Sequence, residues 1–212
     1  MINRQEIVRY LGYGKNQPDE VVSDLIEECI KEVEAAAEPK CVYRRFTLTI
    51  GDDNHIYIAG LDMKSNNLAK NLKGCEEAVL FAATLGVGVD RLLNKNLRFN
   101  MAKASVIQAT AAAYIEDFCN QKQLEIEEIV NNEGKHLRPR FSPGYGDLNI
   151  EIQESFLRAI NAGKMIGVTL SDGNIMIPEK SVSAIMGISS SGERCHIEGC
   201  EVCDNINCQF RR

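Results

Sequence analysis

The chain has 212 residues, 44% of them hydrophobic and 25% charged, a composition typical of one globular domain or of one domain with a small appendage. Its formal net charge of −6 argues against a binder of nucleic acids or anionic membranes, because both need a basic face. No apolar run approaches the ~18 residues that span a bilayer, and the first residues lack the apolar core of a signal peptide. We therefore expect a cytoplasmic protein.

The N-terminal part of the chain predicts two helices and a β-hairpin. Residues 4–14 have the pattern of a short helix that ends at glycine, and a stronger helix with one apolar stripe begins after Asp19. Residues 43–50 and 56–58 then have the apolar pattern of strands, on either side of a turn at residues 51–54.

The middle of the chain predicts a buried strand and a long central helix. Residues 61–72 carry helical spacing, and residues 77–85 form a nearly uninterrupted apolar run that suits a strand buried on both faces. Asn100 can cap a helix from residue 101 to about 123, whose alanines leave room for close packing.

A Gly-Val-Gly sequence at residues 86–88 invites a dinucleotide-binding interpretation, because a glycine-rich turn between a strand and a helix can cradle a phosphate. The third glycine of that motif is missing, since Arg91 stands in its place, and no βαβ unit surrounds the turn. We favour a structural turn.

The C-terminal third contains a long aperiodic loop at residues 131–147, and loops of this length are usually functional or disordered. Residues 150–161 form an amphipathic helical pattern that Gly163 stops. Three strands follow, at residues 165–170, 175–177 and 182–188. Because strands and helices mix without a βαβ rhythm, we expect an α+β fold with a mixed or antiparallel twisted sheet packed with helices.

The aperiodic loop holds a local pattern that suggests a ligand, Arg-Phe-Ser-Pro-Gly-Tyr at residues 140–145. The pair Pro143-Gly144 suits a type II turn, in which proline fixes φ and glycine takes a positive φ, and such a turn exposes backbone groups. Arg140 could bind a carboxylate through a bidentate pair of hydrogen bonds. From these residues alone, a surface turn with a solvated arginine is an equal alternative.

The same residues resemble a known family. Arg140-x-x-x-Gly144-Tyr145 is similar to the Arg-x-x-x-Gly-Tyr segment with which the reactivation domain of cobalamin-dependent methionine synthase holds S-adenosylmethionine. Residues 166–171 and 178–187 resemble the strand pair of that domain that ends in Ser-Val-Ser-Gly. The resemblance is strong over residues 100–187, weaker before them, and nearest to the free-standing versions of the domain.

The resemblance implies a function for residues 1–188 as a methyltransferase component. In that family S-adenosylmethionine methylates cob(II)alamin reductively to methylcobalamin, which reactivates the synthase. Arg140 would bind the methionine carboxylate, Gly144 and Tyr145 would give backbone and ring contacts, and Ser142 and Pro143 would shape the loop. The implied partners are a corrinoid-binding methionine synthase without its own reactivation domain and a flavodoxin-like or ferredoxin-like electron donor.

The chain also departs from the family. The aspartate in an aromatic-rich N-terminal strand has no equivalent here, and Ile-Ser-Ser-Ser at residues 188–191 replaces tyrosines. Some cofactor contacts must therefore come from other residues. Glu133 lies near an acidic position of the family, but in a different register, and we expect it to be a solvated loop carboxylate.

Residues 189–212 predict a linker followed by a Cys-rich tail. Cys195, Cys200, Cys203 and Cys208 place four thiols within fourteen residues. In a reducing compartment such a cluster suggests a zinc site or an iron–sulfur cluster before disulfides, although the spacing matches neither a ferredoxin nor a zinc ribbon. Free or redox-sensing thiols are the alternative. Of the other cysteines, we expect three to be small core residues: Cys29, Cys75 and Cys119.

Two other functions stay open from the sequence. In the first, the chain is a metal or iron–sulfur redox module whose tail is the active part and whose body is a scaffold. In the second, it uses the same cofactor but reactivates a different corrinoid methyltransferase system, because nothing in the sequence names the partner.

Overall fold

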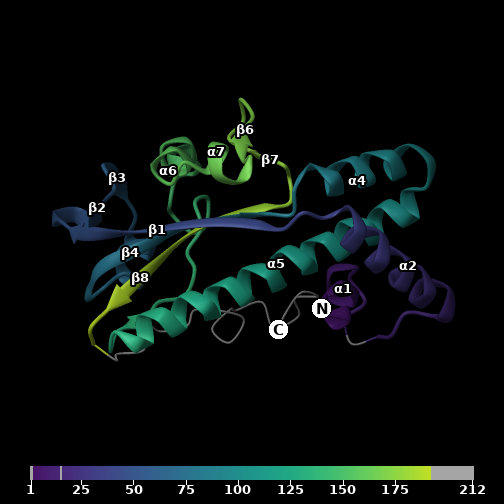
Figure 1. Cartoon of the computed structure of the whole chain (residues 1–212), viewed down its shortest axis with the longest axis horizontal. Helices are drawn as coiled ribbons and strands as arrows, with labels where there is room; N and C mark the ends of the chain where they lie inside the picture. The colour runs from purple at the N-terminus through teal and green to yellow at the C-terminus, as the bar shows by residue number, and fades with distance from the viewer. Residues whose placement is uncertain (1, 15, 192–212) are drawn as a thin grey trace.

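The computed structural model describes residues 2–14 and 16–191, and in them one antiparallel sheet lies between two layers of helices (Figure 1). The six strands are hydrogen-bonded in the order β3-β2-β1-β4-β8-β5. Their bounds are Lys40–Ile50 (β1), His55–Ile58 (β2), Leu61–Lys64 (β3), Cys75–Thr84 (β4), His136–Leu137 (β5) and Ser181–Ser189 (β8). The predicted α+β class with an antiparallel sheet packed with helices is confirmed.

Each face of the sheet has its own helices and its own hydrophobic core. One face packs against α1 (Arg4–Tyr10), α2 (Glu20–Ala36), α4 (Val87–Phe99) and the long α5 (Met101–Asn132). The other packs against α3 (Asn66–Asn71), α6 (Gln153–Ala159) and α7 (Ala162–Ile166), beside a two-stranded hairpin of β6 (Thr169–Leu170) and β7 (Met176–Ile177). None of the described helices combines the length and apolarity needed to cross a membrane.

Strand β4 joins the two cores because its side chains are buried on both faces, as its apolar run predicts. Phe81 belongs to the core beneath α5, whereas its neighbours Leu80 and Ala82 belong to the core beneath α6 and α7. Successive side chains of a strand point to opposite faces, so an apolar residue at every position is what a doubly covered strand requires.

The helix starts agree with the capping residues expected from the sequence. The Asp19 carboxylate accepts a hydrogen bond from Val22 N at the start of α2, and the Asn100 side chain accepts one from Lys103 N at the start of α5. Helix α5 continues nine residues beyond the predicted end at residue 123, because Ile126 and Val130 keep one face buried among glutamates.

Two predicted elements are wrong in type or extent. Residues 61–64 are a strand instead of the start of a helix, because Leu61 and Met63 are buried and alternate with exposed neighbours. Gly163 lies inside α7 instead of stopping a helix, and α6 ends before Asn161, which takes a left-handed φ of 59°. The strand predicted at 165–170 is therefore reduced to its last two residues.

The Gly-Val-Gly turn has a structural role, as we favoured. Gly86 has φ of 81° at the start of α4, and a Cβ atom on Gly88 would come within 2.1 Å of the Ala36 carbonyl oxygen. The glycine therefore lets α4 lie directly against the end of α2.

We predict that Gly88→Ala lowers the free energy of unfolding by about 1–3 kcal/mol, because backbone must move to make room for the methyl group. Urea denaturation followed by circular dichroism measures this. Gly173→Ala is the matched control, since a Cβ there has no neighbour within 4 Å and φ is not positive. Equal stability of the two variants would contradict the close packing of α4 on α2.

An ion-pair network ties the end of α5 to the sheet. The Arg45 guanidinium on β1 lies 2.5 Å from a Glu77 oxygen and 2.7 Å from a Glu133 oxygen, and Lys135 Nζ lies 2.6 Å from Glu77. Glu133 is exposed, as expected of a solvated carboxylate, and the ion pair with Arg45 is what the sequence did not predict. Hydrogen bonds from Arg45, and then from Lys135, lower the pKa of Glu77 from 4.5 to about 2.

We predict that Glu77→Gln lowers the free energy of unfolding at pH 7 by about 1 kcal/mol, since two cations lose a charged partner. The pKa of Glu77 is lower in the folded state, so its contribution is complete above about pH 4.5 and lost as the pH falls toward about 2. The wild type should lose stability across that window more steeply than the variant. Glu76→Gln, on an exposed neighbour in the same strand, should leave the profile unchanged.

Candidate functional site

The loop that contains Arg140 is fixed by hydrogen bonds to the edge of β8. Arg138 N donates to Gly187 O, and Phe141 N donates to Ile185 O. Between these two hydrogen bonds the loop is three residues long, whereas β8 is only two residues long. An extra residue of this kind is a bulge, which redirects a side chain. Phe141 is buried in the core beneath α6, whereas Arg140 turns toward α5 on the opposite face.

The predicted turn follows at once and is confirmed. Tyr145 N donates to Ser142 O across Pro143 and Gly144, and Gly144 has φ of 83°. This is the hydrogen bond and the glycine φ of a type II turn. Pro143 is buried, Ser142 is half-buried, and Tyr145 is 62% exposed with its ring edge-on to Phe141 at 5.4 Å.

The far end of the loop is anchored to α3. The Asp147 carboxylate accepts hydrogen bonds from Ser65 Oγ, from Asn66 N at 2.8 Å and from Asn67 N at 3.2 Å. It therefore supplements the Ser65 cap of this helix. Hydrogen bonding to Ser65 and to the backbone lowers the pKa of Asp147. The loop is thus held at both ends, by β8 and by α3.

The Arg140 side chain contacts the middle of α5, the helix that precedes this loop in the sequence. Its Nη2 atom lies 3.2 Å from a Glu116 carboxylate oxygen and 2.8 Å from the Asn120 amide oxygen. Its Nη1 atom is buried and has no hydrogen-bond partner among the described residues. A buried guanidinium nitrogen without a partner is costly, and a ligand acceptor could supply one.

A small polar pocket of about 230 Å³ borders these groups, between α1 and α5. Three carboxylates line it, those of Glu6, Glu116 and Asp117, together with the polar side chains of Asn3 and Asn120. We call it the α1–α5 pocket. Its carboxylates suit a cationic group, and the adjacent arginine suits an anionic one, so the arrangement can hold a zwitterion.

The sequence did not identify this pocket. Glu116 and Asn120 are spaced i, i+4 on one face of an alanine-rich helix, and this polar pair is the signal that could have been noticed. Asn3 caps α1 with its side chain, and a cap is what its position suggests from the sequence. Of the residues predicted to bind the cofactor, Arg140 contacts two residues that line the pocket, Glu116 and Asn120, without lining it itself, and Tyr145 is exposed in the loop.

The cysteines of the body are structural, as expected. Cys29, Cys75 and Cys119 are buried, and burial raises the pKa of Cys29 to about 11 and that of Cys119 to about 12, so both stay protonated at neutral pH. Within the described residues, no three His, Cys, Asp or Glu side chains gather as a metal site requires. The linker, the tail and its predicted metal ligands, from residue 192 onward, lie outside those residues and stay predictions.

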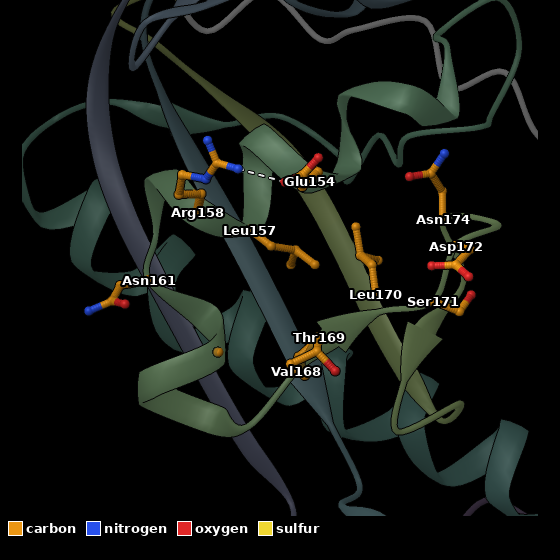
Figure 2. Close-up of a pocket in the computed structure, with 11 residues that line it drawn as sticks. Glu154, Leu157, Arg158, Asn161, Val168, Thr169, Leu170, Ser171, Asp172 and Asn174 are labelled. Carbon is orange, nitrogen blue, oxygen red and sulfur yellow. Dashed lines mark hydrogen bonds and ion pairs between the residues drawn. The ribbon is translucent and has the colours of Figure 1, made fainter.

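A larger hollow of about 570 Å³ lies on the opposite side of the sheet, between α6 and the turn of the β6–β7 hairpin (Figure 2). Leu157 and Leu170 point into it, and Glu154 and Arg158 pair with each other at 2.6 Å on its rim. No residue predicted to bind the cofactor lines this hollow. Its polar rim therefore has no connection with Arg140.

Comparison with known proteins supports the fold. No family model and no curated protein sequence matches the chain. Among solved structures, the chain is similar to a crystal structure of the MetH reactivation domain bound to AdoHcy, with a TM-score of 0.59 and 16% sequence identity, over 89% of this chain and 77% of that one. At this identity the likeness is one of fold.

We predict that Asp147→Ala increases amide hydrogen exchange across residues 142–148, because the loop loses its attachment to α3. Hydrogen–deuterium exchange with mass spectrometry measures this directly. Asp172→Ala, in the exposed turn of the β6–β7 hairpin, is the control and should leave that loop protected. Unchanged exchange in Asp147→Ala would mean that β8 alone orders the loop.

Proposed function

We propose that this chain binds S-adenosylmethionine at the α1–α5 pocket and supports the reductive methylation of a corrinoid. The observation that carries the proposal is that a bulge in the loop beside β8 brings Arg140 against Glu116 and Asn120, two residues of a pocket lined by three carboxylates. The fold likeness to a domain bound to AdoHcy supports it, because AdoHcy is what S-adenosylmethionine becomes after methyl transfer.

The residues fit the amino-acid end of the cofactor. S-adenosylmethionine carries a carboxylate, an ammonium group and a sulfonium group. The Nη1 atom of Arg140 is a donor for the carboxylate, and the carboxylates of Glu116 and Asp117 complement the two cations, together with that of Glu6, which Arg9 also binds at 2.6 Å. Because Nη1 is buried, a ligand reaches it only when the Asn120 or Glu116 side chain shifts.

The pocket is smaller than the ~300–1,000 Å³ of typical small-molecule sites. It therefore takes the methionine part alone, and the adenosine part lies outside it. Gly144 and the exposed Tyr145 ring are the groups we assign to the adenosine side, and Ser142 and Pro143 shape the turn that presents them.

In this proposal the residues of the chain hold S-adenosylmethionine in the orientation that methyl transfer needs. When bound, S-adenosylmethionine would supply a sulfonium methyl group for transfer to the reduced corrinoid, with S-adenosylhomocysteine, a neutral thioether, as the leaving group. Arg140 and the carboxylates hold the amino-acid end, so that the sulfonium faces outward toward a docked corrinoid protein. Alignment of two reactants in this way can lower the activation free energy by several kcal/mol.

The partners are part of the proposal. The corrinoid is carried by a methionine synthase that lacks its own reactivation domain, and the electron comes from a flavodoxin-like or ferredoxin-like protein. Cys195, Cys200, Cys203 and Cys208 would form a zinc or iron–sulfur site in the tail. Metal analysis and visible absorption of the anaerobically purified protein test that assignment.

We predict that Arg140→Ala weakens S-adenosylmethionine binding at least ~10-fold, because the charge-assisted hydrogen bond from Nη1 to the carboxylate is lost. Isothermal titration calorimetry of the anaerobic protein measures this. Arg140→Lys keeps the charge but loses the planar fork, so it should fall between the wild type and Arg140→Ala.

Arg44→Ala is the matched control, since Arg44 is exposed on β1 and belongs to none of the ion pairs of the described residues. It should bind like the wild type. Unchanged affinity in Arg140→Ala, with a circular dichroism spectrum like that of the wild type, would remove the α1–α5 pocket as the cofactor site.

A further inference from the structure

Helix α4 carries a row of cations on its solvent side. Arg91, Lys95 and Arg98 are spaced i, i+4 and i+7, so at ~100° per residue they fall within about 60° of one another around the helix axis. All three are exposed, and the buried residues Val89 and Leu93 lie on the opposite side of the helix. The packing of α4 on the core therefore holds the three cations toward solvent. We call these three residues the α4 stripe.

Helix α2 carries a row of carboxylates with the same spacing. Glu20, Asp24 and Glu27 are exposed and also stand at i, i+4 and i+7. The buried residues of this helix lie on its other side and are Ile26, Cys29 and Val33. We call the three carboxylates the α2 stripe, and it matches the α4 stripe in spacing with the opposite charge.

The two stripes do not neutralise each other within one copy of the chain. Among the described residues no ion pair joins α2 to α4, and the α4 stripe takes part in none. In the α2 stripe, Glu27 lies 3.3 Å from Arg4, and an ion pair as exposed as this one contributes little. Both stripes are therefore available to a second molecule.

Exposed apolar side chains stand beside both stripes. Phe99 is 83% exposed and follows Lys95 by one turn, so it continues the α4 stripe. Val21 is 77% exposed and precedes Asp24 by three residues, so it is a neighbour of the α2 stripe. Apolar anchors among complementary charges are the composition of a protein–protein contact.

We propose that the α4 stripe binds the α2 stripe of a second copy of this chain, so that the protein forms a charge-matched dimer. Both helices lie at the same end of the molecule, away from β2 and β3 (Figure 1). A two-fold arrangement can therefore place α4 of each copy on α2 of the other, and it pairs both stripes twice. Each copy supplies both charges, and the contact does not depend on the proposed function.

The dimer should be weak and sensitive to salt. Two pairs of short helix faces make a small contact, and interfaces below ~1,200 Å² belong to transient complexes. Salt screens the attraction between exposed charges. We therefore expect the dissociation constant of the dimer to rise at least ~10-fold between 20 mM and 200 mM NaCl.

Sedimentation velocity of the full chain over a series of protein concentrations measures this association, with a reductant present to keep the cysteines as thiols. Two variants reverse one stripe each, and they are Arg91→Glu/Lys95→Glu/Arg98→Glu and Glu20→Lys/Asp24→Lys/Glu27→Lys. Each variant has like charges on both helices, so alone it should dimerise at least ~10-fold more weakly than the wild type. An equimolar mixture should dimerise again, because each helix of one variant then meets its opposite charge on the other.

The matched control is Lys64→Glu/Lys73→Glu/Lys164→Glu, which changes the net charge as much as the α4 variant does, on exposed lysines outside α2 and α4. Equal loss in this control would reduce the effect to net charge and overturn the proposal. A wild type that stays monomeric in 20 mM NaCl would overturn it too, as would an α4 variant that dimerises like the wild type. The same holds for a mixture that stays monomeric while circular dichroism shows both variants folded.

Discussion

The architecture depends on β4, a strand whose residues 78–84 are buried between two hydrophobic cores. It pairs with β1 over eight positions and with β8 over nine, and both of its faces are covered by helices. Because side chains alternate between the faces, neither core can form without the other. A polar residue near the middle of this strand would have to be buried on one side.

The candidate site depends on β8, the strand that pairs with β4 on the side away from β1. The edge of β8 receives residues 136–141, and the bulge between Arg138 and Phe141 turns Arg140 toward α5 while Phe141 fills the core beneath α6. A regular strand would put residues 139 and 141 on one face and residue 140 on the other, but would not accommodate Pro139 within the ladder. The irregular backbone therefore accommodates Pro139 while Phe141 anchors the loop in one core and Arg140 faces α5.

Much of the secondary structure could be predicted from local signals. The Asp19 and Asn100 caps, the apolar run of β4 and the Pro143-Gly144 turn each act within a few residues, and all are found in the structure. The predictions were wrong in short stretches where the helical and the strand periodicity fit the sequence equally well. At residues 61–64 and 162–166 the same few apolar residues fit either a strand or a helix, and the sheet or the core decides between them.

The sequence by itself determined the loop chemistry, with Arg140 and a turn that places Gly144 at positive φ, because these properties belong to a run of six residues. The tertiary structure decided that Arg140 meets Glu116 and Asn120, that Glu6 completes the pocket, and that Arg45 joins Glu77 to Glu133. These partners are 20 to 134 residues apart in the sequence, so only the packing of α1 and α5 on the sheet brings them together.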